Sequence, residues 1–179
     1  CLNDNDTYNR FSGKTVRLGA DITVTRMAGG SNHAFTGTFD GQNHKLTLAY
    51  GTADAPVDAQ FVAPFVEVTG GATFRNLTIA GTIYDGYTAS GEHNIGGLIG
   101  IHAKVGAGGF VGLCEHSVSF NDCHSAAVIR SADGSNSGFV AWSRASAYTI
   151  AFTGCLFDGK LLQQNDSGGL NGGFIGWTG

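Results

Sequence analysis

Apolar and polar residues alternate along three segments of the chain, 73–83, 119–129 and 151–161, which share one skeleton. Each has a phenylalanine in its second position, and the residues three, five, seven and nine places later are mostly apolar or small. Because side chains alternate across a strand, those positions lie on one face. The three inward sets are Leu77, Ile79, Gly81 and Ile83; Cys123, Ser125, Ala127 and Ile129; and Cys155, Phe157, Gly159 and Leu161. The pattern predicts a long strand in each segment and a buried ladder of equivalent residues.

Further segments repeat around these strands. Residues 15–25 and 35–48 also alternate, and Asp40-Gly41 interrupts the second segment as a hairpin turn or a sharp corner would. The pattern small-small-apolar-apolar-small recurs at 96–100, 108–112, 137–141 and 172–176. Leu46, Leu77, Cys123 and Cys155 align as equivalent residues with a period of about 31 residues. The middle interval is longer and contains both 96–100 and 108–112, so it carries an insertion, and which of the two elements is the regular one stays open.

An internal period of this length, with strand alternation and no helical periodicity, predicts an all-β fold. Such repeats are best buried by coiling, so that each strand pairs with its equivalent in the next turn. We therefore expect a parallel β-helix (solenoid) of about four coils, with a β-sandwich as the alternative. Residues 1–179 are expected to form a single β-helix repeat domain. Since the chain begins inside a repeat region, we expect it to be a fragment of a longer surface protein.

Composition supports strands and argues against some partners. The chain has 29 Gly, 12 Phe and only 2 Pro, which favours strands joined by glycine-permitted bends. Charged residues make up 13% and the net charge is −4, so neither nucleic acid nor an anionic membrane is an expected partner. No apolar run is long enough to span a membrane.

The cysteines and histidines predict neither a disulfide framework nor a metal site. Cys123 and Cys155 would stack in register on neighbouring coils, where side chains point the same way and the Cβ atoms stay too far apart for a relaxed disulfide. We expect free thiols that act as small hydrophobic groups. The six histidines lack metal-ligand spacing, and no segment predicts a cofactor.

The Gly-rich elements GGLIG, GGFVG and GGFIG, together with FTGTFDGQNHKLTL, APFVEV, ATFRNLTIAGTI and CLFDGKL, resemble the GLUG-motif repeat proteins of bacterial cell surfaces. The likeness extends from about residue 13 to residue 177. It implies a right-handed β-helix that is secreted or anchored at the cell surface, of the kind described as adhesin-like. The family supplies no catalytic residues to transfer to this chain.

The outward positions of the long strands carry the candidate binding residues. His124, Asp158 and Lys160 would form a small polar cluster if neighbouring coils align. A polysaccharide lyase needs clustered acids and a base with a lowered pKa, whereas this face offers one acid, so a solvated surface cluster is the favoured interpretation. Sugars stack on exposed aromatic rings, which makes Tyr84, Tyr87, Trp142 and the loop 100–107 further candidates for a ligand groove.

Three hypotheses about function follow. The favoured one is a noncatalytic, extracellular module of the bacterial cell surface, which binds a glycan or a host surface protein through its loops. The second is a structural stalk or spacer that stacks on neighbouring repeats or domains of the parent chain. The third is a polysaccharide lyase or hydrolase-like β-helix enzyme, which would require several acids converging in one cleft.

Overall fold

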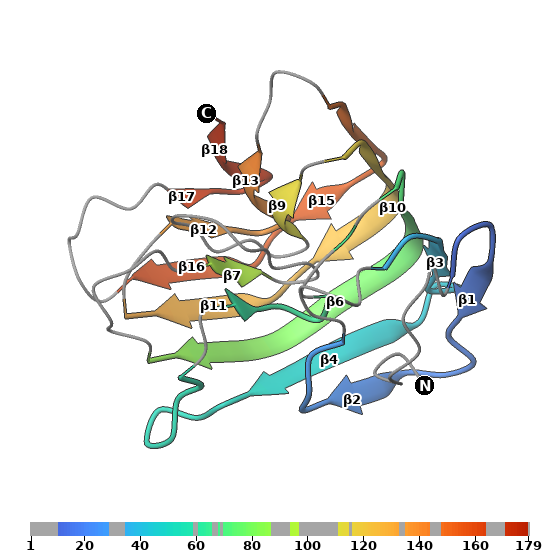
Figure 1. Ribbon diagram of the computed structural model, residues 1–179. Coiled ribbons are helices and arrows are strands. Elements are labelled where there is room, and N and C mark those ends of the chain that lie inside the picture. The colour runs from blue at the N-terminus through green and yellow to red at the C-terminus, as the bar shows by residue number, and fades with distance from the viewer. Residues whose placement is uncertain are drawn as a thin grey trace.

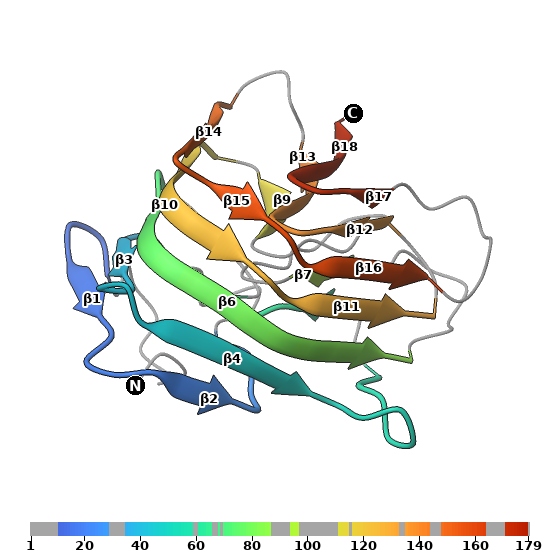
Figure 2. The same ribbon diagram turned by 180° about the vertical axis from the view of Figure 1, so that it is seen from behind.

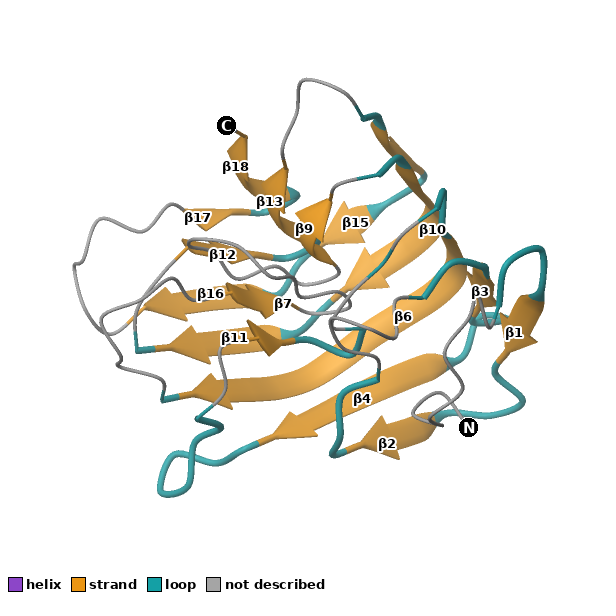
Figure 3. Cartoon of the chain, viewed as in Figure 1, coloured by secondary structure: helices purple, strands orange, loops and turns teal. Residues whose placement is uncertain are grey.

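The computed structural model describes residues 11–28, 35–58, 61–65, 68, 70–86, 94–96, 111–114, 116–132, 135–143, 148–163 and 171–178. Strands are the only regular secondary structure in these ranges, which confirms the predicted all-β class (Figure 3). They form one large, curled sheet and two small ones, and every strand pair among the described residues is parallel.

The large sheet contains ten strands, and β6 is its longest and central member. Its strands are β1 (Thr15–Arg17), β2 (Ile22–Val24), β3 (Thr38–Asp40), β4 (Lys45–Tyr50), β6 (Thr73–Asp85), β10 (Val118–Ser125), β11 (Val128–Ser131), β14 (Ile150–Thr153), β15 (Leu156–Phe157) and β16 (Lys160–Gln163). The order is β1-β3-β6-β10-β14 at one end of the strands and β2-β4-β6-β11-β16 at the other. The β6 strand therefore joins the two halves of the sheet (Figure 1).

Two small sheets lie on one face of the large sheet. One has the order β5-β7-β12-β17 and the other β9-β13-β18. Their strands are β5 (Phe61–Val62), β7 (Asn94–Gly96), β12 (Ser135–Ser137) and β17 (Asn171–Gly172), and β9 (Val111–Cys114), β13 (Val140–Ser143) and β18 (Ile175–Thr178). Figure 2 shows the opposite face of the large sheet, which the small sheets leave uncovered. The chain passes from the large sheet through both small sheets and returns one strand further along, as from β6 through β7 and β9 to β10.

The segments that share a skeleton pair in the register that the sequence predicts. Phe120 lies opposite Phe74 on one side and Phe152 on the other. Both neighbouring rings stack on that of Phe120, with centroids 5.6 and 5.2 Å away. The ring of Phe139 meets Phe120 edge-on and stacks on Phe174. Stacked and edge-on contacts are the favoured aromatic geometries, and the two aromatic columns form the centre of the core.

The predicted inward face of the long strands is also confirmed. Leu77, Ile79 and Ile83 of β6 are buried, and so are Cys123, Ser125, Ala127 and Ile129 in the next copy. In the third copy, Cys155, Phe157 and Leu161 are partly buried against the same core. The alternation in the sequence was therefore sufficient to identify the core face of each long strand.

A sharp corner, and not a hairpin, follows Asp40. Both β3 and β4 pair in parallel with the single strand β6, so the chain cannot reverse between them. Backbone with positive φ marks this corner in each copy, at Gln42 and Asn43, at Asn76, at Asp122 and at Gly154. Asn, Asp and Gly adopt this conformation more readily than other residues. Each of the four corners therefore includes a residue that suits the bend, and Gln42 is the exception among the positions with positive φ.

The first copy has extra residues at its corner, which corrects the alignment based on Leu46. Leu46 lies opposite Ile79 and not opposite Leu77. The insertion in the middle interval is also located. Gly96 pairs with Ser137 and Val111 pairs with Val140, so residues 97–110 stand where the next copy has only Gly138 and Phe139. The first residue of the element 96–100 and the last two of the element 108–112 therefore each have an equivalent in the next copy, so neither element as a whole is the insertion.

Candidate functional site

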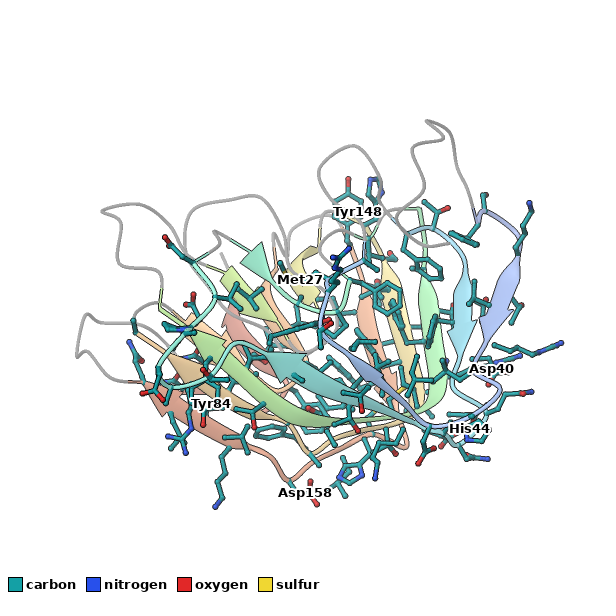
Figure 4. All side chains as sticks on the ribbon, turned by 90° about the horizontal axis from the view of Figure 1, so that it is seen from below. Met27, Asp40, His44, Tyr84, Tyr148 and Asp158 are labelled. Carbon is teal, nitrogen blue, oxygen red and sulfur yellow. The ribbon has the colours of Figure 1, made fainter. Side chains whose placement is uncertain are left out.

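The uncovered face of the large sheet, called here the outer face, carries the residues that alternate with the core. On the central strands these are Thr78, Ala80, Thr82 and Tyr84 of β6; His124, Ala126, Val128 and Arg130 beside β6; and Leu156, Asp158, Lys160 and Leu162 one strand further. On β6 and beside it, small side chains dominate the middle, and the larger side chains of His124, Tyr84 and Arg130 stand toward the two ends. Figure 4 shows Tyr84 and Asp158 projecting from this face.

His124 and Asp158 form a hydrogen-bonded pair at one end of the outer face. His124 Nε2 lies 2.7 Å from Asp158 Oδ1. The parallel pairing positions both residues, because His124 lies opposite Leu156 and the Asp158 amide donates to the carbonyl of Ser125. The two side chains keep 34% and 55% of their exposure. The pair is open to solvent, and such exposed ion pairs contribute at most about 1 kcal/mol to stability.

Tyr84 and Arg130 occupy the other end of the outer face. They lie opposite one another on β6 and β11, and the guanidinium carbon of Arg130 is 5.6 Å from the centre of the Tyr84 ring. This is within the range of a cation–π contact. Sequence reasoning identified Tyr84 but missed Arg130. The alternation that places His124 on the outer face also places Arg130 there, and it was the available signal.

Lys160 stands on the outer face between these two groups. It lies opposite Val128, while Arg130 lies opposite Leu162, so Lys160 and Arg130 are diagonal neighbours on adjacent strands. Diagonal neighbours on one face of a sheet are roughly 7–8 Å apart, within reach of long side chains. Lys160 also follows Asp158 by two residues on the same face. The sheet thus brings His124, Asp158 and Lys160 onto one surface, as the sequence suggested.

Of the remaining predicted binding residues, the structure describes Trp142 alone. Trp142 belongs to β13 of a small sheet, where its backbone pairs with Trp177 and Leu113. The small sheets lie across the core from the outer face, so the backbone of Trp142 is not part of the outer-face strands. Tyr87 and the loop 100–107 lie outside the described residues.

A buried ionic cluster at the corner was not predicted from the sequence. Asp40 is buried, and its Oδ2 accepts from Arg75 Nε at 3.1 Å and Nη2 at 3.0 Å. Its Oδ1 accepts from Asn76 Nδ2 at 3.1 Å and from the Gln42 amide at 3.0 Å. Burial raises the pKa of Asp40, but the hydrogen bonds from Asn76, Gln42 and Arg75 outweigh it, so the pKa lies below its ordinary value. The cluster ties the first corner to the second and has a structural role.

The two stacked cysteines, Cys123 and Cys155, differ in the pKa of their thiols. Cys123 and Cys155 are free thiols, as predicted. Hydrogen bonding to Cys123 lowers the pKa of Cys155 to about 7, while the bond to Cys155 and burial raise the pKa of Cys123. Cys155 is the more exposed of the two, so it carries the negative charge when the pair loses a proton. The thiols are therefore not interchangeable hydrophobic groups.

The described residues bring together no group of three or more His, Cys, Asp or Glu side chains that is able to hold a metal ion. In the described part of the chain there is also no helix that is long and apolar enough to cross a bilayer. Comparison of the chain with protein-family models, curated proteins and solved structures gives no match.

Proposed function

We propose that this chain is a noncatalytic, adhesin-like module of a bacterial cell surface, folded as a right-handed parallel β-helix, which binds a glycan on its outer face. The β-helix is supported by the circuits that leave the large sheet, cross both small sheets and return one strand further along. A conventional β-sandwich is built from antiparallel sheets, whereas the pairs between described strands are parallel. The extracellular location is supported by the resemblance to GLUG-motif proteins.

The observation that carries the binding proposal is the distribution of side chains on the outer face. Between Thr78 and Tyr84 the face runs for roughly 20 Å along β6, and its middle is lined by small residues of adjacent strands. Polar groups stand at both ends, with the His124–Asp158 pair at one and Tyr84 with Arg130 at the other. A long surface with an aromatic ring, hydroxyls and fixed charges suits a short run of sugar units.

An enzymatic function is less well supported. The central strands offer one carboxylate on the outer face, Asp158, and it is hydrogen-bonded to His124. A glycosidase uses a pair of carboxyl groups. A β-helix lyase or hydrolase therefore has fewer groups available on this surface than its chemistry requires. Incubating the protein with its preferred glycan and measuring new reducing ends or unsaturated products tests this alternative directly.

A glycan array provides the test of the binding proposal. We expect the protein to bind selected glycans on the array. Thr82→Trp should abolish this binding, because it places a bulky ring in the middle of the outer face. Thr153→Trp is the matched control, since Thr153 is an exposed residue near the edge of the large sheet in β14. Binding that survives Thr82→Trp, or that both variants lose equally, would contradict the outer-face site. A host protein as ligand would appear as binding to glycan-free host surface proteins.

A further inference from the structure

Two cationic side chains on the outer face form no ion pair with another described residue. Arg130 and Lys160 are diagonal neighbours, as described above, and neither takes part in an ion pair between described residues. The Nε atom of Arg130 is buried without a hydrogen-bond partner, and its guanidinium rests against Tyr84. The neighbouring carboxylate, Asp158, is engaged by His124. Two cations are thus left side by side and available to an anion.

This arrangement is notable because the whole chain is acidic. Its net charge of −4 repels polyanions in general, so attraction must be local. At physiological ionic strength, dissolved salt screens the interaction between charges that are more than roughly 8 Å apart. An anionic group that reaches Arg130 and Lys160 therefore experiences those two cations together with the single carboxylate of Asp158, and the local balance stays positive. Arg also binds a carboxylate through two parallel hydrogen bonds, which Lys cannot do.

The geometry of the sheet favours a polysaccharide over a peptide. An extended peptide gains most of its affinity by adding a strand to the edge of a sheet, where backbone groups are free. On the outer face, the backbone groups of β6, β10 and β11 are committed to the neighbouring strands. Hydroxyls of sugars need no such groups and can bond to Thr78 and Thr82 beside the Tyr84 ring.

From this placement we infer that the ligand is an acidic polysaccharide, whose carboxylates are held by Arg130 and Lys160 while its sugar rings lie along the small residues of β6 and its neighbours. The inference rests on the proposed function and specifies its ligand class. The acid groups supply the orientation, because they fix one end of the bound chain at Tyr84. A neutral glycan of the same shape would bind without that anchor.

The test compares two polymers that differ only in charge. Polygalacturonate and the same polymer with its carboxyl groups reduced to alcohols are titrated by calorimetry against the protein, at low and at physiological salt. We expect the acidic polymer to bind at least tenfold more tightly and to weaken as salt rises. Lys160→Gln alone should weaken binding, because it removes one of the two cations. Lys160 is exposed, so this substitution does not endanger the fold. Arg130→Gln together with Lys160→Gln should remove the preference for the acid polymer.

Lys14→Gln is the matched control. It removes the same charge from an exposed residue just before β1, an edge strand of the large sheet that is separated from β11 and β16. Unchanged affinity in this variant and unchanged melting temperatures in all variants support the inference. Equal binding of both polymers, or equal effects of Lys14→Gln and Lys160→Gln, overturns the acidic class but leaves a glycan site. Preference for polyglutamate overturns it in favour of a protein partner, and binding to no glycan at all overturns the proposed function itself.

Discussion

Replacing Asp40 by asparagine should measure how strongly the corner cluster stabilises the fold. Asp40 is buried and receives hydrogen bonds from Arg75, Asn76 and the Gln42 amide. Asparagine keeps an acceptor oxygen but removes the charge, and its amide group would have to face other donors. Hydrogen bonds to a charged group contribute about 1.5–3 kcal/mol each, and breaking a buried ion pair costs about 3–5 kcal/mol.

The expected cost is lower than that full range because Arg75 keeps 43% of its side-chain exposure and water can solvate it in the variant. We expect Asp40→Asn to reduce the free energy of unfolding by about 2–3 kcal/mol at pH 7. For a chain of this size that corresponds to a melting temperature lower by roughly 4–12 °C.

The pH dependence provides a second, independent check. The pKa of Asp40 is lowered in the folded protein, so its contribution is fully present above the unfolded pKa, about 3.9. The contribution is lost as the pH falls through the folded pKa, because both states then bind the proton. The difference between wild type and Asp40→Asn should therefore be constant from pH 7 to pH 5 and shrink below about pH 4.

The assay is urea denaturation of both proteins, followed by circular dichroism at several pH values. Asp158→Asn is the control, because it removes the same charge from an exposed pair and should cost at most about 1 kcal/mol. A cost below about 0.5 kcal/mol for Asp40→Asn at pH 7, or a cost that persists unchanged at pH 3, would refute the argument.

Three further predictions concern the core, a glycine and a thiol. Phe120→Ala should cost about 3–5 kcal/mol in denaturant titrations, and Phe174→Ala, at a ring that is 38% exposed, less than half as much; equal costs would contradict the aromatic columns. Gly81→Ala should destabilise more than Gly71→Ala, since both have positive φ but a Cβ at Gly81 would clash with the backbone oxygen of Leu48, while at Gly71 it meets nothing; thermal melts that rank them the other way would refute the clash. In native protein at pH 8, Cys155 should react with iodoacetamide faster than the buried thiol beside it, and peptide mass spectrometry that finds the reverse order would disprove the assignment of the thiolate.

The strand alternation was readable from the sequence because burial and side-chain direction share a period of two. The phenylalanines of the three long segments and the inward sets that follow them occupy the predicted core positions. Free Cys123 and Cys155 followed from the same register. These features depend on local geometry repeated from copy to copy, so a single sequence contains enough information to recover them.

The alignment at the first corner could not be recovered in this way. Leu46 and Leu77 look equivalent because each is the first apolar residue after a polar turn, yet the sheet places Leu46 opposite Ile79. The extra residues are absorbed at Gln42 and Asn43, whose positive φ values no hydrophobic pattern reports. The Asp40 cluster was missed for the same reason, since it joins residues of two successive corners.

By itself, the sequence determined that this protein is built of strands, which residues of each long strand enter the core, and that His124, Asp158 and Lys160 share one face. Only the tertiary structure decided which residues meet across strands. It placed Arg130 over Tyr84 and beside Lys160, assigned Trp142 to a different sheet, and located the insertion at 97–110. The reason is physical. Alternation is a property of one strand, whereas a binding surface depends on the register between strands, which is set by corners and insertions where the periodic pattern stops.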